Sequence, residues 1–273
     1  MVAQGKILIV LGMHRSGTSL CSRWLHNAGV DMGETLLSGT ESNPFGHYED
    51  LDFLHFHERL LRSNGQNYLV TSLDDIPVID PKLRKEAKRV VAQKNEKKSQ
   101  WGFKDPRTCL FAEFWDSVCE SATYLVIFRK YGEVVQSLAN REIGIAVRDS
   151  GFIRKLFYRI FGLKSLTNYV LNRQQDYLSA WIVYNQKILD FVARKPKEDC
   201  CIIDYQDFLE QYQRVEQWLF NRGFDITPGL YPAISSSPPG SKRFVDFDEA
   251  YCRSEHLLLA KKIQAQMRSL AAA

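Results

Sequence analysis

The chain has 273 residues, and its 36 Lys or Arg against 32 Asp or Glu give a formal net charge of +4. This length suffices for one α/β domain with a full core, and we predict a single domain over residues 1–273. The balanced charge argues against a nucleic-acid-binding arm. No apolar run approaches the ~20 residues of a membrane span, and no targeting segment is evident, so a cytoplasmic protein is expected. The six cysteines have neither metal-ligand nor disulfide-framework spacing, so reduced, packed thiols are expected.

The first informative motif is a glycine-bounded loop that follows an apolar run at residues 6–11. The run predicts a buried strand, and the residues after the loop predict a helix. Such a loop directs backbone N–H groups and a helix N-terminus at one place, which is an anion site. Gly12 and Gly17 have P-loop spacing, but Thr18 stands where a nucleoside-triphosphate enzyme has its lysine. The cation of this loop is Arg15 instead.

This arrangement resembles the sulfotransferase superfamily, whose donor is 3′-phosphoadenosine 5′-phosphosulfate (PAPS). The family's 5′-phosphosulfate loop has a basic residue followed by Ser/Thr-Gly-Thr/Ser, which residues 15–19 match. The resemblance implies that PAPS and its product, 3′-phosphoadenosine 5′-phosphate (PAP), bind to His14, Arg15, Ser16, Gly17, Thr18 and Ser19. A purely structural turn is the alternative for this loop taken alone.

A second motif follows the apolar run at residues 122–129, which ends in Arg129. The helix predicted near 132–142 carries Ser137, and Arg141 lies one turn further on the same face. An arginine at a strand end with a serine in the next helix resembles the family's 3′-phosphate site. A guanidinium grips a phosphate through two N–H groups, and a hydroxyl adds a neutral donor. Each residue alone has an ordinary structural explanation, so the prediction depends on the pair.

Further pieces occur in the order found in bacterial members of the family. Residues 43–49 resemble a turn that leads to an acidic residue, 101–107 a short strand with a Lys-Asp-Pro-Arg ending, and 202–209 the strand before a late helix. Related enzymes close the nucleotide pocket with a basic, glycine-containing loop near the C-terminus. Lys242 and Arg243 are therefore candidates for the 3′-phosphate, with a surface loop as the alternative.

Alternating strands and helices predict an α/β fold, with a parallel sheet covered by helices on both faces as in P-loop nucleotide kinases. The predicted strands lie near residues 6–12, 100–104, 122–129 and 200–205, with a further candidate near 67–71. The predicted helices lie near residues 17–29, 50–63, 81–97, 109–119 and 132–142. A helical insertion is predicted at about 151–195.

The start of that insertion, residues 152–161, has one apolar stripe and an opposite face with Arg154, Lys155 and Arg159. Packed core, a lid over the acceptor site and a helix at an anionic membrane surface all stay open for it.

The resemblance also implies a mechanism, in which an acceptor hydroxyl or amine attacks sulfur while the leaving phosphate takes up charge. Arg15 is predicted to stabilise that charge, Lys104 is a second candidate, and no metal is required. Glu49 is the predicted general base, with His47 as runner-up, because both follow a turn that would present them over the donor. Apolar surroundings would raise the pKa of the carboxyl toward neutrality. The alternative for Glu49 is an ordinary first-turn residue of the next helix.

Three functions stay open. The favoured one is a sulfotransferase of the bacterial type that acts on a hydroxyl or amine of an unknown acceptor, such as a carbohydrate or a small metabolite. The second is a P-loop kinase or nucleotide hydrolase, against which the absence of a lysine after Gly17 argues. The third is a non-catalytic nucleotide-binding protein on the same fold. No motif indicates the acceptor or the oligomeric state.

Overall fold

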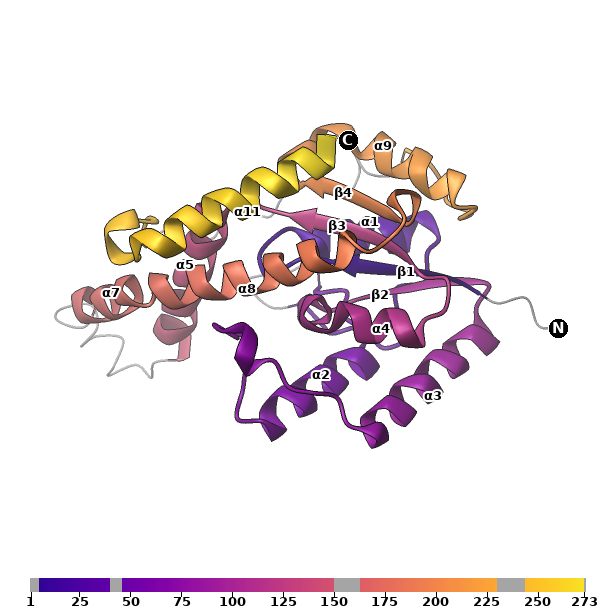
Figure 1. Cartoon of the computed structure of the whole chain (residues 1–273), viewed down its shortest axis with the longest axis horizontal. Coiled ribbons are helices and arrows are strands. Elements are labelled where there is room, and N and C mark those ends of the chain that lie inside the picture. The colour runs from indigo at the N-terminus through magenta and orange to yellow at the C-terminus, as the bar shows by residue number, and fades with distance from the viewer. Residues whose placement is uncertain (1–4, 40–45, 150–162, 230–243, 273) are drawn as a thin grey trace.

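The computed structural model describes residues 5–39, 46–149, 163–229 and 244–272. Within them, a four-stranded parallel sheet has the strand order β2-β1-β3-β4 (Figure 1). Its strands are β1 (Lys6–Leu11), β2 (Gln100–Lys104), β3 (Thr123–Phe128) and β4 (Cys200–Asp204). The predicted α/β fold with a parallel sheet is confirmed.

One predicted strand is wrong, because residues 67–71 form no β-strand. The side chain of Asn67 accepts a hydrogen bond from the backbone N–H of Leu69, and the backbone oxygen of Tyr68 accepts one from the Tyr184 hydroxyl. The segment packs against the core. Its apolar residues therefore reflect the burial of a connecting segment whose backbone bonds to side chains instead of a neighbouring strand.

The strands bury side chains on both faces of the sheet. In β1, Ile7, Ile9 and Leu11 belong to one core, and Leu8 and Val10 belong to the other. This alternation follows from the two-residue period of a strand. Because both faces are covered, the whole run is apolar, which is the signature that the sequence showed.

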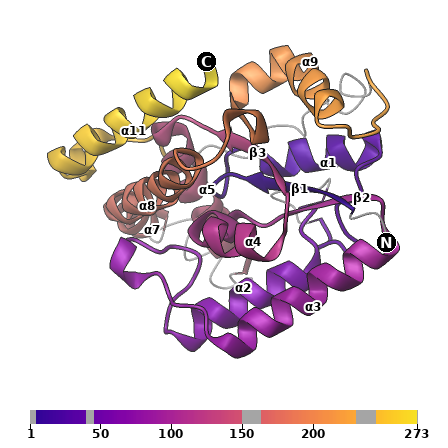
Figure 2. The same ribbon diagram turned by 45° about the vertical axis from the view of Figure 1, so that its right-hand side comes forward.

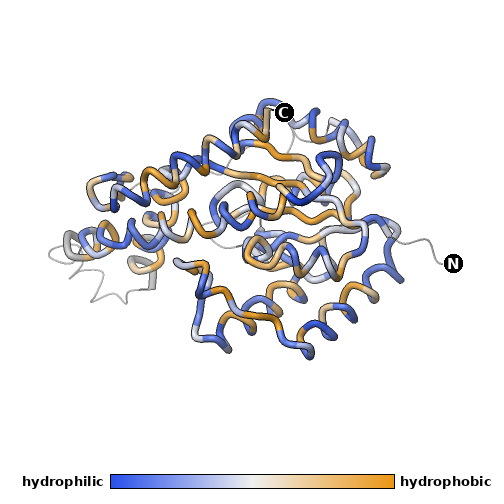
Figure 3. Tube along the Cα trace, in the orientation of Figure 1, coloured by the Kyte–Doolittle hydropathy of each residue, from blue (hydrophilic) through white to orange (hydrophobic). Residues whose placement is uncertain are grey.

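Helices cover the two faces unequally. Beside Leu8 and Val10 lie α1 (Thr18–Ala28) and α9 (Tyr205–Asn221), on the side of the sheet opposite α2, α3 and α4 (Figure 2). The helices of the larger core are α2 (Leu51–Ser63), α3 (Pro81–Lys97), α4 (Ala112–Val118), α5 (Tyr131–Asp149), α7 (Leu163–Asn172), α8 (Gln174–Val192) and α11 (Ser254–Ala272). Figure 3 shows apolar strands enclosed by helices that carry hydrophilic stretches.

The connections that follow the neighbouring strands β1 and β3 pass to opposite faces of the sheet. After β1 it enters α1 on one face, and after β3 it enters α5 on the other face. Two adjacent parallel strands with such connections leave a crevice at their carboxyl ends, where ligands of open α/β sheets bind. The predicted anion loop and the predicted 3′-phosphate motif both start at this crevice.

The predicted insertion includes a helix of the central core. Within α8, Trp181 is completely buried, and the ring of Phe191 lies 4.7 Å from that of Tyr124 in β3. This part of the segment is therefore one of the layers that cover the sheet. The amphipathic stretch at residues 152–161 lies outside the described residues. In the described part of the chain, every helix is too short or too polar to cross a bilayer.

The segment predicted as a helix over 109–119 is built in two parts. A 3₁₀-helix spans Pro106–Phe111, and α4 follows it. The Asp105 side chain accepts a hydrogen bond from the backbone N–H of Arg107, and Pro106 occupies the first position, where a missing N–H costs nothing. The helical structure therefore begins earlier than predicted, directly after β2.

The loop after β1 requires glycine at position 17. Gly17 has a φ of 91°, and a Cβ atom there would lie 2.1 Å from the ring of Tyr205, the first residue of α9. Arg15 also has a positive φ, of 70°. The loop is thus held in a left-handed conformation with an aromatic ring packed directly on its backbone.

We predict that Gly17→Ala is much more destabilising than Gly65→Ala. Gly65 also has a positive φ, but a Cβ there meets no atom within 4 Å. Gly65→Ala should therefore lower the free energy of unfolding by only about 1 kcal/mol, which is the cost of a left-handed backbone for a residue with a side chain. Gly17→Ala should lower it by about 3 kcal/mol or more, because overpacking against Tyr205 adds to that cost. Urea unfolding measures both losses.

A matched control is the same pair of substitutions in a Tyr205→Ala background. There, Gly17→Ala should cost no more than Gly65→Ala. Equal losses in the original background would show that the Tyr205 ring does not constrain the loop.

Candidate active site

A cleft of about 200 Å³ opens at the carboxyl end of the sheet, beside the ends of β1 and β3. Most of the predicted site residues line it, namely His14, Arg15, Gly17, Thr18, Ser19, His47, Glu49, Arg129 and Arg141. These residues come from separate parts of the sequence, and the crevice between the strands brings them together.

Three arginines converge in the cleft. Nε of Arg15 donates a hydrogen bond to the Ser137 hydroxyl at 2.8 Å, and Nη1 of Arg129 donates one to the backbone oxygen of Arg15 at 3.4 Å. Burial, together with the charges of Arg141 and Arg129, lowers the pKa of Arg15 to about 10. Arg15 is still protonated near neutral pH. The cleft therefore holds concentrated positive charge.

That charge is only partly compensated by the protein. Nε of Arg129 lies 2.7 Å from Oε2 of Glu133, and its guanidinium lies 5.1 Å from the centre of the Tyr205 ring. Among the described residues, Arg15 and Arg141 form no ion pair with a carboxylate. Glu133 and Tyr205 were not predicted from the sequence as residues of this site. The spacing of four residues between Arg129 and Glu133 was a usable signal, whereas the contact with Tyr205 had none.

Residues that line the cleft also contain buried polar atoms without a partner among the described residues. Helix α1 begins without a side-chain cap and without an acidic residue in its first turn. In the described part of the chain, Nε2 of His14 and Nε of Arg141 are buried without a hydrogen-bond partner. Buried polar groups are normally satisfied by protein, water or ligand. A helix N-terminus, three arginines and the unpaired Nε–H group of Arg141 together fit a ligand with several negative charges.

The two histidines of the cleft are uncharged. Burial, then the charges of Lys104, Arg141 and Arg15, lowers the pKa of His47 to about 4. Burial, then the charge of Arg107, lowers the pKa of His14 well below its ordinary value. Near neutral pH both rings therefore have a lone pair that accepts a proton.

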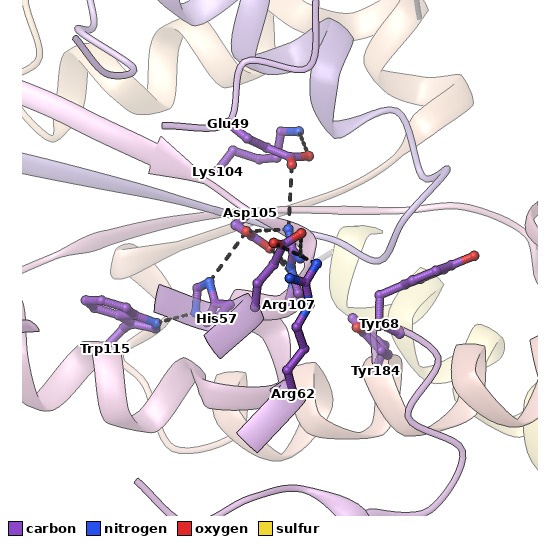
Figure 4. Close-up of polar contacts among 10 residues, drawn as sticks. Glu49, His57, Arg62, Tyr68, Lys104, Asp105, Arg107, Trp115 and Tyr184 are labelled. Carbon is purple, nitrogen blue, oxygen red and sulfur yellow. Dashed lines mark hydrogen bonds and ion pairs between the residues drawn. The ribbon is translucent and has the colours of Figure 1, made fainter. Parts of the chain in front are cut away.

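Glu49 lies among cations. Its Oε1 is 2.8 Å from Nζ of Lys104, and its Oε2 is 3.8 Å from Nη2 of Arg107 (Figure 4). The apolar surroundings predicted for this carboxylate are therefore wrong, because Lys104 ends β2 and Arg107 follows it on the same side. Nζ of Lys104 is also 3.3 Å from the Ser19 hydroxyl. Glu49 is not the cap of α2 either, since Asp50 accepts the capping hydrogen bond.

Several predicted residues lie away from the surface of the cleft. Ser16 is completely buried, Lys104 has 1% of its surface exposed, and neither lines the cleft. Ser137 reaches the site through its bond to Arg15. Lys242 and Arg243 lie outside the described residues. Within the described residues, no group of three or more His, Cys, Asp or Glu side chains is arranged to hold a metal ion.

No protein-family model and no curated protein sequence matches the chain. Solved structures match it over nearly its whole length. A sulfotransferase domain from the curacin biosynthetic pathway is 13% identical, with a TM-score of 0.51 over 95% of this chain and 98% of that one. A sulfotransferase from Alicyclobacillus acidocaldarius is 12% identical, with a TM-score of 0.51 over 99% and 97%. One from Mycobacterium tuberculosis is 15% identical, with a TM-score of 0.52 over 97% and 77%. The chain therefore has the fold of sulfotransferases, as its loop and strand motifs predicted.

We predict that anion binding in this cleft takes up protons through His47. Burial, with the charges of Lys104, Arg141 and Arg15 added to it, lowers the pKa of this ring to about 4. A bound anion offsets those charges, so the pKa rises from about 4 toward its ordinary value of 6.5. Between these values the complex then holds more protons than the free protein, and the contribution of His47 to affinity increases as the pH falls. Titration calorimetry with inorganic pyrophosphate at about pH 5.5, in buffers of different ionisation enthalpy, measures the uptake.

The variant His47→Asn should take up fewer protons than the unmodified chain. His55→Asn, at an exposed position of α2, should be unchanged. Because both comparisons use the same ligand, protonation of pyrophosphate cancels. Identical uptake with and without His47 would contradict the prediction.

Proposed function

We propose that the chain is a sulfotransferase that moves a sulfuryl group from PAPS to a hydroxyl or amine of an acceptor. The observation that carries the proposal is the convergence of Arg15, Arg129 and Arg141 on the uncapped N-terminus of α1. The fold shared with sulfotransferases supports it, although fold alone does not define an activity.

In this proposal the two ends of the donor bind to different groups. The 5′-phosphosulfate lies against the first turn of α1 and Arg15, where backbone N–H groups are unsatisfied. The 3′-phosphate binds to Arg129 and Arg141, with Ser137 as a further donor. The hydrogen bond from Arg15 to Ser137 supports this arrangement, since it connects the two halves of the site.

The reaction forms a bond from the acceptor oxygen or nitrogen to sulfur and breaks the bond from sulfur to the bridging oxygen. The electron pair of the broken bond stays on the 5′-phosphate of PAP, and the acceptor proton goes to a base. Arg15 and the N–H groups of α1 stabilise the charge that develops on the leaving phosphate. Lys104 is near enough to Ser19 to contribute to the same task. No metal ion takes part in this scheme.

Glu49 is the proposed base, with His47 as the alternative. Both line the cleft beside Arg15 and Arg141. Glu49 is ion-paired with Lys104, so movement of the Lys104 ammonium toward the anionic donor would leave its Oε1 available for a proton. His47 is already neutral near pH 7 and accepts a proton without any such rearrangement.

We predict that the chain binds PAP much more tightly than AMP, because only PAP has the 3′-phosphate. Arg129→Ala should remove most of that preference. The loss of a charge-assisted contact of about 1.5–3 kcal/mol corresponds to an affinity for PAP that is about 10- to 100-fold lower. Arg59→Ala, which removes an exposed arginine of α2, should leave both affinities unchanged. Titration calorimetry with PAP and AMP tests this, and equal affinity of the unmodified chain for both ligands would rule out the 3′-phosphate site.

A further titration with ATP, together with turnover assays, separates the competing functions. Preference for ATP over PAP, with Mg²⁺-dependent turnover, would select the P-loop kinase or hydrolase. Tight PAP binding without release of PAP from PAPS, over a panel of hydroxyl and amine acceptors and water, would select a non-catalytic nucleotide-binding protein.

We predict that Glu49→Gln lowers kcat by about 10²- to 10⁴-fold, the usual contribution of a general base. PAP affinity should stay near normal, because the amide keeps the shape of the side chain. His47→Asn should reduce kcat much less. The reversed pattern would exchange the two roles, and normal turnover in both variants would place the base elsewhere.

A further inference from the structure

A chain of buried polar side chains runs from the aromatic core to Glu49 (Figure 4). It passes from Trp115 in α4 to His57 in α2 and then to Asp105 and Arg107, which follow β2. Arg107 is the member that reaches Glu49. None of these four residues lines the cleft.

Asp105 and Arg107 form a two-point ion pair. Nε of Arg107 lies 2.8 Å from Oδ1 of Asp105, and Nη2 lies 2.9 Å from Oδ2. Burial disfavours ionisation of Asp105, but the charge of Arg107 and the proximity of His57 hold the pKa of the carboxyl below its usual range. This fork sets the plane of the guanidinium and leaves Nη1 and Nη2 directed at Glu58, 3.4 Å away, and at Glu49, 3.8 Å away.

Trp115 sets the tautomer of His57. The indole N–H can only donate, and it donates to Nε2 of His57 at 2.8 Å. Nε2 therefore carries the lone pair, and the proton of the neutral ring is on Nδ1. Nδ1 lies 3.5 Å from Oδ2 of Asp105. The ring thus presents an N–H to the carboxylate that holds Arg107.

The two oxygens of Glu49 are held by different cations. Oε1 is beside Lys104, which also contacts the anion loop through Ser19, and Oε2 is beside Arg107. Rotation of the carboxylate would separate it from one cation or the other. A buried network of this kind is rarely the most stable way to fill a core, so a role in orientation accounts for it better than a role in stability.

We propose that Arg107 is a positioning residue that orients the Glu49 carboxylate, and that Asp105, His57 and Trp115 hold the Arg107 guanidinium in place. The proposal rests on the proposed function, since it assigns an orienting device to the proposed base.

A double-mutant cycle between Arg107→Lys and Glu49→Gln tests it. Lysine keeps the charge but loses the fork. Arg107→Lys should lower kcat for PAP release about 10- to 100-fold, because the base is misplaced, while PAP affinity changes less than about twofold. In the Glu49→Gln background, Arg107→Lys should lower kcat no further. Arg62→Lys, which alters an exposed arginine paired with Glu58, is the control and should leave kcat unchanged.

Multiplicative losses in the double variant would overturn the proposal, because they would show that Arg107 acts independently of Glu49. If the unmodified chain neither binds PAP nor releases it from PAPS, the proposed function fails, and this proposal fails with it. The two failures are therefore distinguishable.

A second comparison does not require that Arg107 be altered. Trp115→Phe removes the indole N–H whose hydrogen bond His57 accepts. Trp101 belongs to the same aromatic cluster, and Trp101→Phe removes an indole N–H whose hydrogen bond Asn95 accepts. Nitrogen-15 spectra of the histidine rings should show the Nδ1–H form of His57 in the unmodified chain and in Trp101→Phe, but a mixture of tautomers in Trp115→Phe. At matched thermal stability, kcat should fall only in Trp115→Phe. Equal kcat in the two variants, or an Nε2–H ring in the unmodified chain, would overturn the proposal.

Discussion

The structure depends most on the positive charge that it concentrates at one end of its sheet. Burial, together with the neighbouring charges of Arg141 and Arg129, lowers the pKa of Arg15 to about 10. Glu133 compensates only Arg129. Partly buried charges of one sign are costly unless a partner offsets them, and the N-terminus of α1 adds more positive potential. The protein holds these groups together because the loop after β1, the end of β3 and helix α5 carry them, and an anionic ligand is the partner that would lower the cost.

The sheet topology explains why these charges meet. β1 and β3 are neighbours, and the helices that follow them pass to opposite faces of the sheet. Each strand end therefore opens toward the same crevice without a helix crossing it. The loop after β1 gains a further constraint from Tyr205, whose ring packs on the backbone of Gly17 and also lies beside Arg129. One aromatic side chain thus joins the end of β4 to the loop after β1 and to Arg129 at the end of β3.

A second group of charged side chains, which meets the cleft at Glu49, alternates in sign. Lys104, Glu49, Arg107 and Asp105 follow one another at distances of 2.8 to 3.8 Å. This row is nearly shielded from solvent, and each member has a partner of opposite sign. The cleft therefore combines two kinds of electrostatics, a cluster of cations that is only partly compensated and is suited to binding an anion, and a fully paired row suited to holding a carboxylate still. In the proposed reaction, the first would serve the donor and the second would serve the acceptor proton.

The sequence alone determined the features that depend on short-range order. Apolar runs predicted the four strands, the spacing from Gly12 to Gly17 predicted the loop, and the helical period placed Ser137 and Arg141 on one face. Residues 67–71 misled this reasoning, because an apolar run shows that a segment is buried but not what its backbone bonds to. Only the tertiary structure decided the surroundings of Glu49 and the contact between Gly17 and Tyr205. It also decided the placement of His57, which contacts Asp105 and Trp115, two residues that lie 48 and 58 positions further along the chain. Such contacts arise when strands and helices pack, and no local pattern encodes which distant side chains will meet.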